Sequence, residues 1–167
     1  MTAGDAVAAA ARALVGVRFR AQGRDPALGL DCVGVAVAAL RAAGVSVAVR
    51  GDYPLRSARW NGNDGPGGVV RCAGDAPGDV LLLRIDATQL HVAVRTAGGI
   101  VHADAGLRRV VERPGALGWP IVAAWRGAES RAERGPSGHR HDRESRPRRG
   151  RQAMPHRIDG MPPEAGR

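Results

Sequence analysis

The chain has 167 residues, of which 44% are hydrophobic and 3% aromatic, and its formal net charge is +9 at pH 7. This composition suits one globular domain with additional residues, and it excludes a disulfide scaffold and a membrane-spanning run, because only two cysteines and no long apolar stretch are present. All 25 residues counted as Lys or Arg are arginine. A positive net charge of this size favours binding to polyanions, but it does not indicate whether the polyanion is nucleic acid, an anionic membrane or an anionic wall polymer.

The first predicted element is a helix over residues 3–15. Its apolar residues recur every three to four positions, which is typical of a surface helix with one buried face. Asp5 and Arg12 lie within it and no basic cluster precedes it, so we do not interpret it as a signal peptide. We therefore expect synthesis in the cytoplasm without a signal peptide.

A loop leads to a second predicted helix that begins after Asp31 and ends at Gly44. Asp31 is a favourable N-cap residue, and the apolar residues that follow it keep helical spacing until the glycine. Cys32 stands in the first turn, where unpaired backbone N–H groups and the helix dipole favour a thiolate. This position predicts a reactive cysteine with a low pKa rather than a packing residue.

Five strands are predicted after the Gly-rich loop 61–68, over segments 76–85, 89–96, 100–106, 107–113 and 119–126. The second of them alternates apolar and other residues, and a tight turn joins it to the third, which indicates a β-hairpin. Helices followed by an antiparallel sheet favour an α+β fold. We expect the helices to pack on a five-stranded, mainly antiparallel sheet.

The ordered domain is predicted to cover residues 1–126, and residues 127–167 are predicted to form a disordered Arg-rich tail. The tail holds 10 arginines, 6 acidic residues and almost no aliphatic residue, so it cannot bury enough apolar area to fold. It could contact nucleic acid through phosphates, but it has no aromatic residue for base stacking. Two of its histidines, His139 and His141, are expected to stay solvated.

The predicted hairpin places His91 and His102 in adjacent strands, with both side chains on one face of the sheet. If the second helix packs on that face, its first turn brings Cys32 within reach of His91. A thiol nucleophile, a base that pairs with it and a group that orients the base make a catalytic triad. Asp104, two residues after His102, is the rival for the orienting role.

Other interpretations of these residues are weaker. A zinc site made of Cys32, Cys72, His91 and His102 lacks the usual ligand spacing, so we expect neither a metal nor an organic cofactor. Cys72 is interpreted as a spectator thiol, and Asp31 as an N-cap only.

Four segments in this order, "GLDCVG", "PGDVLLL", "HVAV" and "VHA", resemble the NlpC-type family of papain-like cell-wall peptidases. The opening "GVRFR", "GRDP" and "GLDCVG" is similar to the subgroup found in phage tails. The resemblance covers residues 8–126. It implies a papain-like α+β fold, with Cys32 as nucleophile, His91 as general base and His102 as orienting residue.

The resemblance also implies a substrate and a setting. Such an enzyme hydrolyses peptide or amide bonds in peptidoglycan stem peptides. The protein would belong to the tail of a phage or phage-like particle, where tail proteins are its partners and the periplasm or cell wall is its place of action.

Two positions depart from the family pattern. Val33 follows the cysteine where a serine is usual, and Phe19 stands where many members have a tyrosine that helps the oxyanion site. Without that hydroxyl, the oxyanion depends more on backbone N–H groups, including that of Cys32. Phe19 favours the main alternative, a weak or inactive papain-like module that binds the wall or serves the tail structurally. Two further rivals are an acyltransferase on the same scaffold and a nucleic-acid-binding protein that uses the tail.

Overall fold

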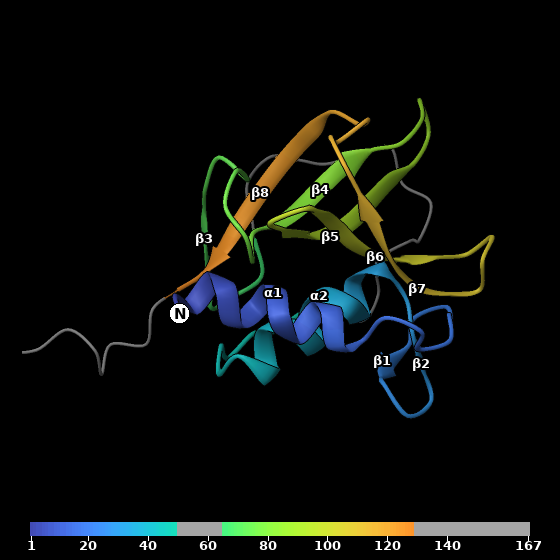
Figure 1. Ribbon diagram of the computed structural model, residues 1–167, viewed down its shortest axis with the longest axis horizontal. Helices are drawn as coiled ribbons and strands as arrows, with labels where there is room; N and C mark the ends of the chain where they lie inside the picture. The colour runs from blue at the N-terminus through green and yellow to red at the C-terminus, as the bar shows by residue number, and fades with distance from the viewer. Residues whose placement is uncertain (50–64, 129–167) are drawn as a thin grey trace, which may run out of the picture. The chain divides into compact units, whose positions relative to one another are not determined.

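The computed structural model describes residues 1–49 and 65–128, which lie in the compact unit Met1–Glu133 (Figure 1). The predicted tail from residue 129 onward and residues 61–64 of the predicted loop lie outside the described residues. Neither described helix is long enough to span a membrane.

Two helices form one layer of the domain. Helix α1 (Ala3–Ala13) begins with a capping box, in which Thr2 and Asp5 bond reciprocally to each other's backbone N–H groups. Helix α2 (Cys32–Ala42) begins at the N-cap Asp31 and ends before Gly44, whose φ of 82° suits a glycine at a helix C-terminus. The sequence-based limits of the second helix are confirmed.

The second layer is a six-stranded sheet in which every described pairing is antiparallel. Its order is β3-β8-β4-β5-β6-β7. The strands are β3 (Val69–Arg71), β4 (Val80–Arg84), β5 (Leu90–Thr96), β6 (Gly99–Asp104), β7 (Arg109–Pro114) and β8 (Ile121–Gly127). The expected architecture of helices on an antiparallel sheet is confirmed.

Two small strand features are absent from the sequence-based prediction. The predicted five strands correspond to β4–β8, while β3 adds a short edge strand beside β8. Strands β1 (Arg24–Asp25) and β2 (Gly29–Leu30) form a separate two-stranded sheet just before α2. Strand β3 is set by a distant backbone partner, and β1 and β2 have only two residues each, so none of the three carries a hydrophobic pattern that the sequence could reveal.

The two faces of the large sheet bury different side chains. One face carries Val80, Leu82, Val94 and Val101, which pack with the buried residues of α1 and α2 in the main core. The opposite face carries a smaller core, Leu81, Leu83, Ala93, Ile100 and Ala124, against which Leu117 and Trp119 pack. Because side chains alternate along a strand, His91 and His102 belong to the face opposite the helices.

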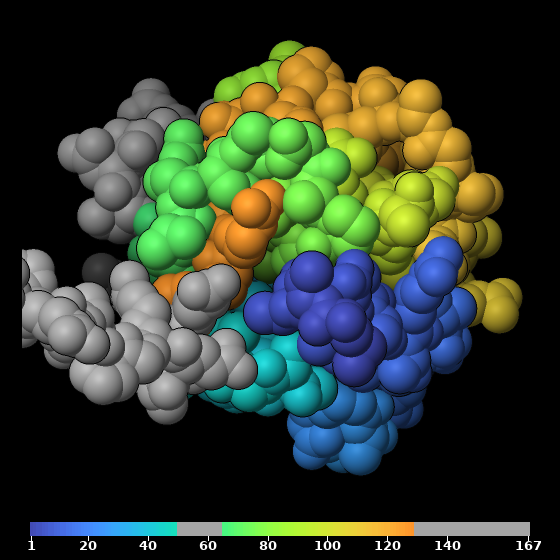
Figure 2. Space-filling view, turned by 60° about the vertical axis from the view of Figure 1, so that its left-hand side comes forward, coloured from blue at the N-terminus to red at the C-terminus, as the bar shows by residue number. Residues whose placement is uncertain are grey.

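The start of α1 and the end of β8 lie together. A Cβ atom at Gly4 would collide with the Pro77 carbonyl, and residues 2–4 line one cavity with Arg126 and Gly127. Figure 2 shows these blue, green and orange segments side by side. The end of β8 is fixed further by Arg126, which binds both carboxylate oxygens of the buried Asp79 at 2.7 and 2.9 Å.

Candidate active site

The first turn of α2 is fixed in place by Asp31. Its Oδ1 atom accepts a hydrogen bond from the Gly34 N–H at 2.7 Å and another from Arg24 at 2.6 Å. Asp31 is fully buried, so the ion pair with Arg24 compensates a charge that water cannot reach. The predicted N-cap role of Asp31 is confirmed, and it presents Cys32 as the first helical residue.

His91 and His102 form a hydrogen-bonded pair. The Nε2 atom of His91 lies 2.9 Å from Nδ1 of His102, and the two rings are nearly perpendicular, at 87°. The side chain of His102 is buried, whereas that of His91 is half-buried. This contact leaves Nδ1 of His91 as the ring nitrogen available to a third group.

Cys32 reaches the histidines by a route that differs from the expected one. The expectation placed α2 on the histidine face, but α2 packs on the other face, against Val94 and Val101. The backbone pairing of β5 with β6 ends at Val94–Val101, while β5 continues to Leu90 and β6 to Asp104. Beyond this last pair, the backbone N–H of Val92 lies in hydrogen-bonding reach of the Cys32 thiol. The start of α2 therefore meets β5 in the part of the strand that is not paired with β6.

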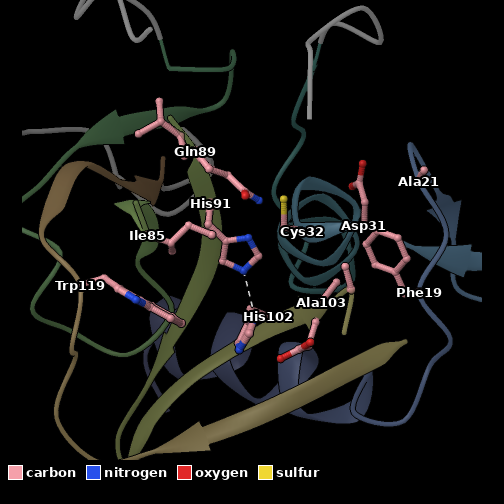
Figure 3. Close-up of a pocket in the computed structure, with 13 residues that line it drawn as sticks. Phe19, Ala21, Asp31, Cys32, Ile85, Gln89, His91, His102, Ala103 and Trp119 are labelled. Atoms are coloured by element: carbon pink, nitrogen blue, oxygen red, sulfur yellow. Dashed lines mark hydrogen bonds between the residues drawn. The ribbon is translucent and has the colours of Figure 1, made fainter. Parts of the chain in front are cut away.

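The thiol and the imidazoles line one cavity of about 430 Å³. Figure 3 shows the Cys32 sulfur on the side of the His91 ring, and His102 below His91, joined to it by the dashed hydrogen bond. Phe19 lies on the other side of Cys32, and Trp119 lies beyond the two imidazoles. The described hydrogen bonds include none between Cys32 and His91. Hydrogen bonds between a nucleophile and its base are often long before substrate binds, so the arrangement is compatible with proton transfer from Cys32 to His91 in a substrate complex.

The thiol is electrostatically different from what its position in the sequence predicts. Burial raises the pKa of Cys32, and the negative charge of Asp31 raises it further. The N–H groups of Val92, Val33 and Cys32 act in the opposite direction without outweighing burial. The expected low pKa of Cys32 is therefore wrong: the site favours the thiol.

The imidazoles are also held in their neutral forms. Burial lowers the pKa of His91 to about 4, with a further contribution from the neighbouring His102. Burial lowers the pKa of His102 as well, while the charge of Asp104 opposes this shift. A neutral His91 beside a thiol is prepared to accept a proton, whereas a protonated one would not be.

The other residues considered in the sequence analysis, Asp104 and Cys72, are not paired with Cys32 or His91 among the described hydrogen bonds. Asp104 lines the cavity, but its Oδ1 atom accepts the Leu107 N–H at 2.9 Å and so closes the turn after β6. Cys72 lies near Gly74 and Asp79, and burial raises the pKa of its thiol. Among residues 1–49 and 65–128, no three His, Cys, Asp or Glu side chains are grouped to hold a metal ion.

Sequence reasoning did not identify Trp119 as part of this site. Its ring is 6.4 Å from that of His91 and 6.1 Å from that of His102, centroid to centroid. It belongs to the connection between β7 and β8, which no motif marks. With only 3% aromatic residues in the chain, the rarity of tryptophan was the one available signal.

Comparisons with known proteins agree with this architecture. No family model matches the sequence, and no curated protein matches it. Among solved structures, NlpC2 from Trichomonas vaginalis is similar at 21% identity and a TM-score of 0.54, over 75% of this chain and 47% of that one. NlpC1 from the same organism is similar at 19% identity and a TM-score of 0.53, over 74% and 44%.

A third similar structure is the NlpC/p60 domain of the peptidoglycan hydrolase SagA, at 24% identity and a TM-score of 0.47, over 66% of this chain and 88% of that one. The chain spans less than half the length of NlpC1 and NlpC2. At these identities the likeness is one of fold. The chain has the α+β, papain-like fold that NlpC1 and NlpC2 share.

Proposed function

We propose that this protein is a cysteine hydrolase that cleaves peptide bonds in peptidoglycan stem peptides. The observation that carries the proposal is the cavity in which Cys32 faces His91, whose other ring nitrogen is bonded to His102. The NlpC-like fold and the four motifs that resemble the NlpC-type family support the same chemistry. The substrate class rests on that resemblance.

The geometry suits a mechanism in which proton transfer accompanies attack. As the Cys32 sulfur attacks the scissile carbonyl, its proton passes to Nδ1 of His91. His91 then gives this proton to the leaving amine, and a thioester remains on Cys32. In the second half, His91 takes a proton from water as the oxygen attacks the thioester. The C–S bond then breaks, His91 returns this proton to the Cys32 sulfur, and the new carboxyl group leaves with the product.

His102 serves this cycle by fixing the tautomer of His91. When Nδ1 of His91 must accept the thiol proton, the other ring proton resides on Nε2 and is donated to Nδ1 of His102. The Cys32 backbone N–H at the start of α2 is the candidate donor to the oxyanion, since Phe19 offers no hydroxyl.

The first test is digestion of purified peptidoglycan, with mass spectrometry of the released fragments. We expect fragments cut within the stem peptide from the wild-type chain and none above background from Cys32→Ser, because a serine hydroxyl is a weaker nucleophile than a thiol and gives up its proton to His91 less readily. Cys72→Ser is the matched control and should retain activity. Fragments from Cys32→Ser at the wild-type rate would refute the nucleophile assignment.

A second function, a wall-binding module with little or no activity, is favoured by Phe19. This ring occupies a cavity wall where a hydroxyl would help the oxyanion. The same digestion separates the two functions: pelleting with peptidoglycan without fragment release supports the binding module. Phe19→Tyr should then increase any residual hydrolysis.

We also propose that the protein acts as part of a phage or phage-like particle tail and works at the periplasm or wall. Only the similarity of "GVRFR", "GRDP" and "GLDCVG" to the phage-tail subgroup supports this setting. Proteomics of purified particles from the producing cell tests it. Recovery of the chain only in the soluble cell fraction would contradict it.

A further inference from the structure

Trp119 stands edge-on to both members of the histidine pair. The interplanar angles are 70° with His91 and 87° with His102, so three rings meet at the cavity wall in mutually steep orientations. Such edge-to-face arrangements are favourable between aromatic rings and restrict how each ring can turn. Trp119 therefore limits the rotation of both imidazoles.

Trp119 is itself held from two sides. The Arg113 guanidinium on β7 lies 4.5 Å from the centroid of its ring, which is a cation–π distance. The next residue, Pro120, accepts a backbone hydrogen bond from Arg84 of β4 at 3.0 Å. These contacts fix the ring against the histidines although its loop has no helix or strand of its own.

Charged groups around His91 and His102 influence whether these histidines are protonated. Asp104 on β6 favours protonated histidines, whereas Arg113 on β7 disfavours protonation of His102. From α2, Cys32 faces His91, and Asp31 is paired with Arg24. Because these charges act in opposite directions, burial from water is the main cause that keeps His91 and His102 neutral.

We propose that Trp119, held by Arg113, is a positioning residue that keeps the His91–His102 hydrogen bond dry and directs Nδ1 of His91 toward Cys32. The catalytic meaning of this role rests on the proposed function. The positioning itself is a property of the described rings and can be tested without a substrate.

The substrate-free test is an NMR titration of the histidines in the full chain. Trp119→Ala should raise the pKa values of His91 and His102 toward the ordinary value of 6.5, because water then solvates their charged forms. Trp119→Phe should keep them near the wild-type values, since a ring remains. Leu117→Ala is the matched control: it removes apolar area from the same loop outside the cavity lining.

The kinetic test follows hydrolysis of wall fragments across pH. Trp119→Ala should reduce kcat at least tenfold and move the acid limb of the profile to higher pH, while Trp119→Phe should stay within about threefold of wild type. Arg113→Gln should give a smaller change in the same direction. If Trp119→Ala unfolds, the Phe and Arg113 variants still decide.

Unchanged histidine pKa values in Trp119→Ala would overturn the proposal, as would an equal shift in Leu117→Ala. A wild-type chain that releases no wall fragment would instead refute the proposed function, and the titration would still judge Trp119.

Discussion

The hydrogen bond between His91 and His102 determines which nitrogen of His91 faces the thiol. Nε2 is occupied by His102, and Nδ1 remains on the cavity side. Asp104 lies in the same cavity wall and acts on both histidines through its charge, yet its Oδ1 atom is used by the turn after β6. At the scale of single residues, orientation and charge therefore come from different side chains.

These separate roles predict which of two substitutions reduces the hydrolysis rate more. His102→Ala should reduce the hydrolysis rate by about a hundredfold or more, because His91 loses the contact that fixes its tautomer. Asp104→Asn should reduce it far less, since an amide oxygen can still accept the Leu107 N–H. Steady-state rates on soluble stem peptides measure both. A larger loss in Asp104→Asn would give the orienting role to the carboxylate.

At the scale of elements, the first turn of α2 is packed against the chain that precedes it. A Cβ atom at Gly34 would collide with the Gly23 carbonyl oxygen and approach the Leu30 side chain at 3.2 Å. Gly23 and Leu30 adjoin or belong to β1 and β2. The small sheet thus provides the surface on which the Cys32-bearing turn rests, and only glycine lets the two backbones approach so closely.

Gly34→Ala is therefore expected to destabilise the domain by about 1–3 kcal/mol, because the added methyl overpacks this contact. It should also move Cys32 relative to His91 and lower the hydrolysis rate. Urea unfolding and peptide kinetics test both effects. Gly98→Ala is the control, since no atom lies within 4 Å of its added Cβ. Equal stability of the two variants would contradict the close approach.

Elements with a strong local signal were predictable from the sequence. Asp31 and Gly44 mark the ends of α2 through capping preferences, and the alternation in residues 89–96 with a tight turn marks the hairpin of β5 and β6. The same alternation placed His91 and His102 on one face, which their 2.9 Å contact confirms.

What the sequence did not reveal depends on tertiary packing. The face on which α2 packs follows from the combined core of both helices, and the thiol reaches His91 because β5 and β6 stop pairing at Val94–Val101. The raised pKa of Cys32 comes from burial, which no local pattern reports. Trp119 enters the site from a loop whose path is set by contacts with Arg113 and β4.

At the scale of the whole molecule, burying two neutral histidines couples the stability of the domain to pH. The folded-state pKa of His91 is about 4, below its ordinary value of 6.5, and that of His102 is also lowered. The unfolded chain therefore binds more protons between these values. The contribution of these histidines to stability is therefore fully present above pH 6.5 and should be lost as the pH drops toward 4.

For His91 alone, the free energy of unfolding should fall by about 3 kcal/mol between pH 7.5 and pH 4. Urea unfolding across this range measures the fall. His91→Gln should show a clearly smaller fall, while His139→Gln, a tail position predicted to be solvated, should behave as wild type. Parallel pH curves for wild type and His91→Gln would show that His91 is not held neutral in the fold.

The neighbouring positions of Gly4, Pro77 and Arg126 have a consequence for protein architecture. Helix α1, 11 residues and about 16 Å long, starts in this group, and the chain continues from its end to Phe19, which lines the cavity of Cys32 and His91. The start of α1 and the end of β8 thus line a different cavity from the one that holds Cys32 and His91. Such a unit can be spliced into a surface loop of a host protein, or circularly permuted through a short linker, and still present its cavity outward.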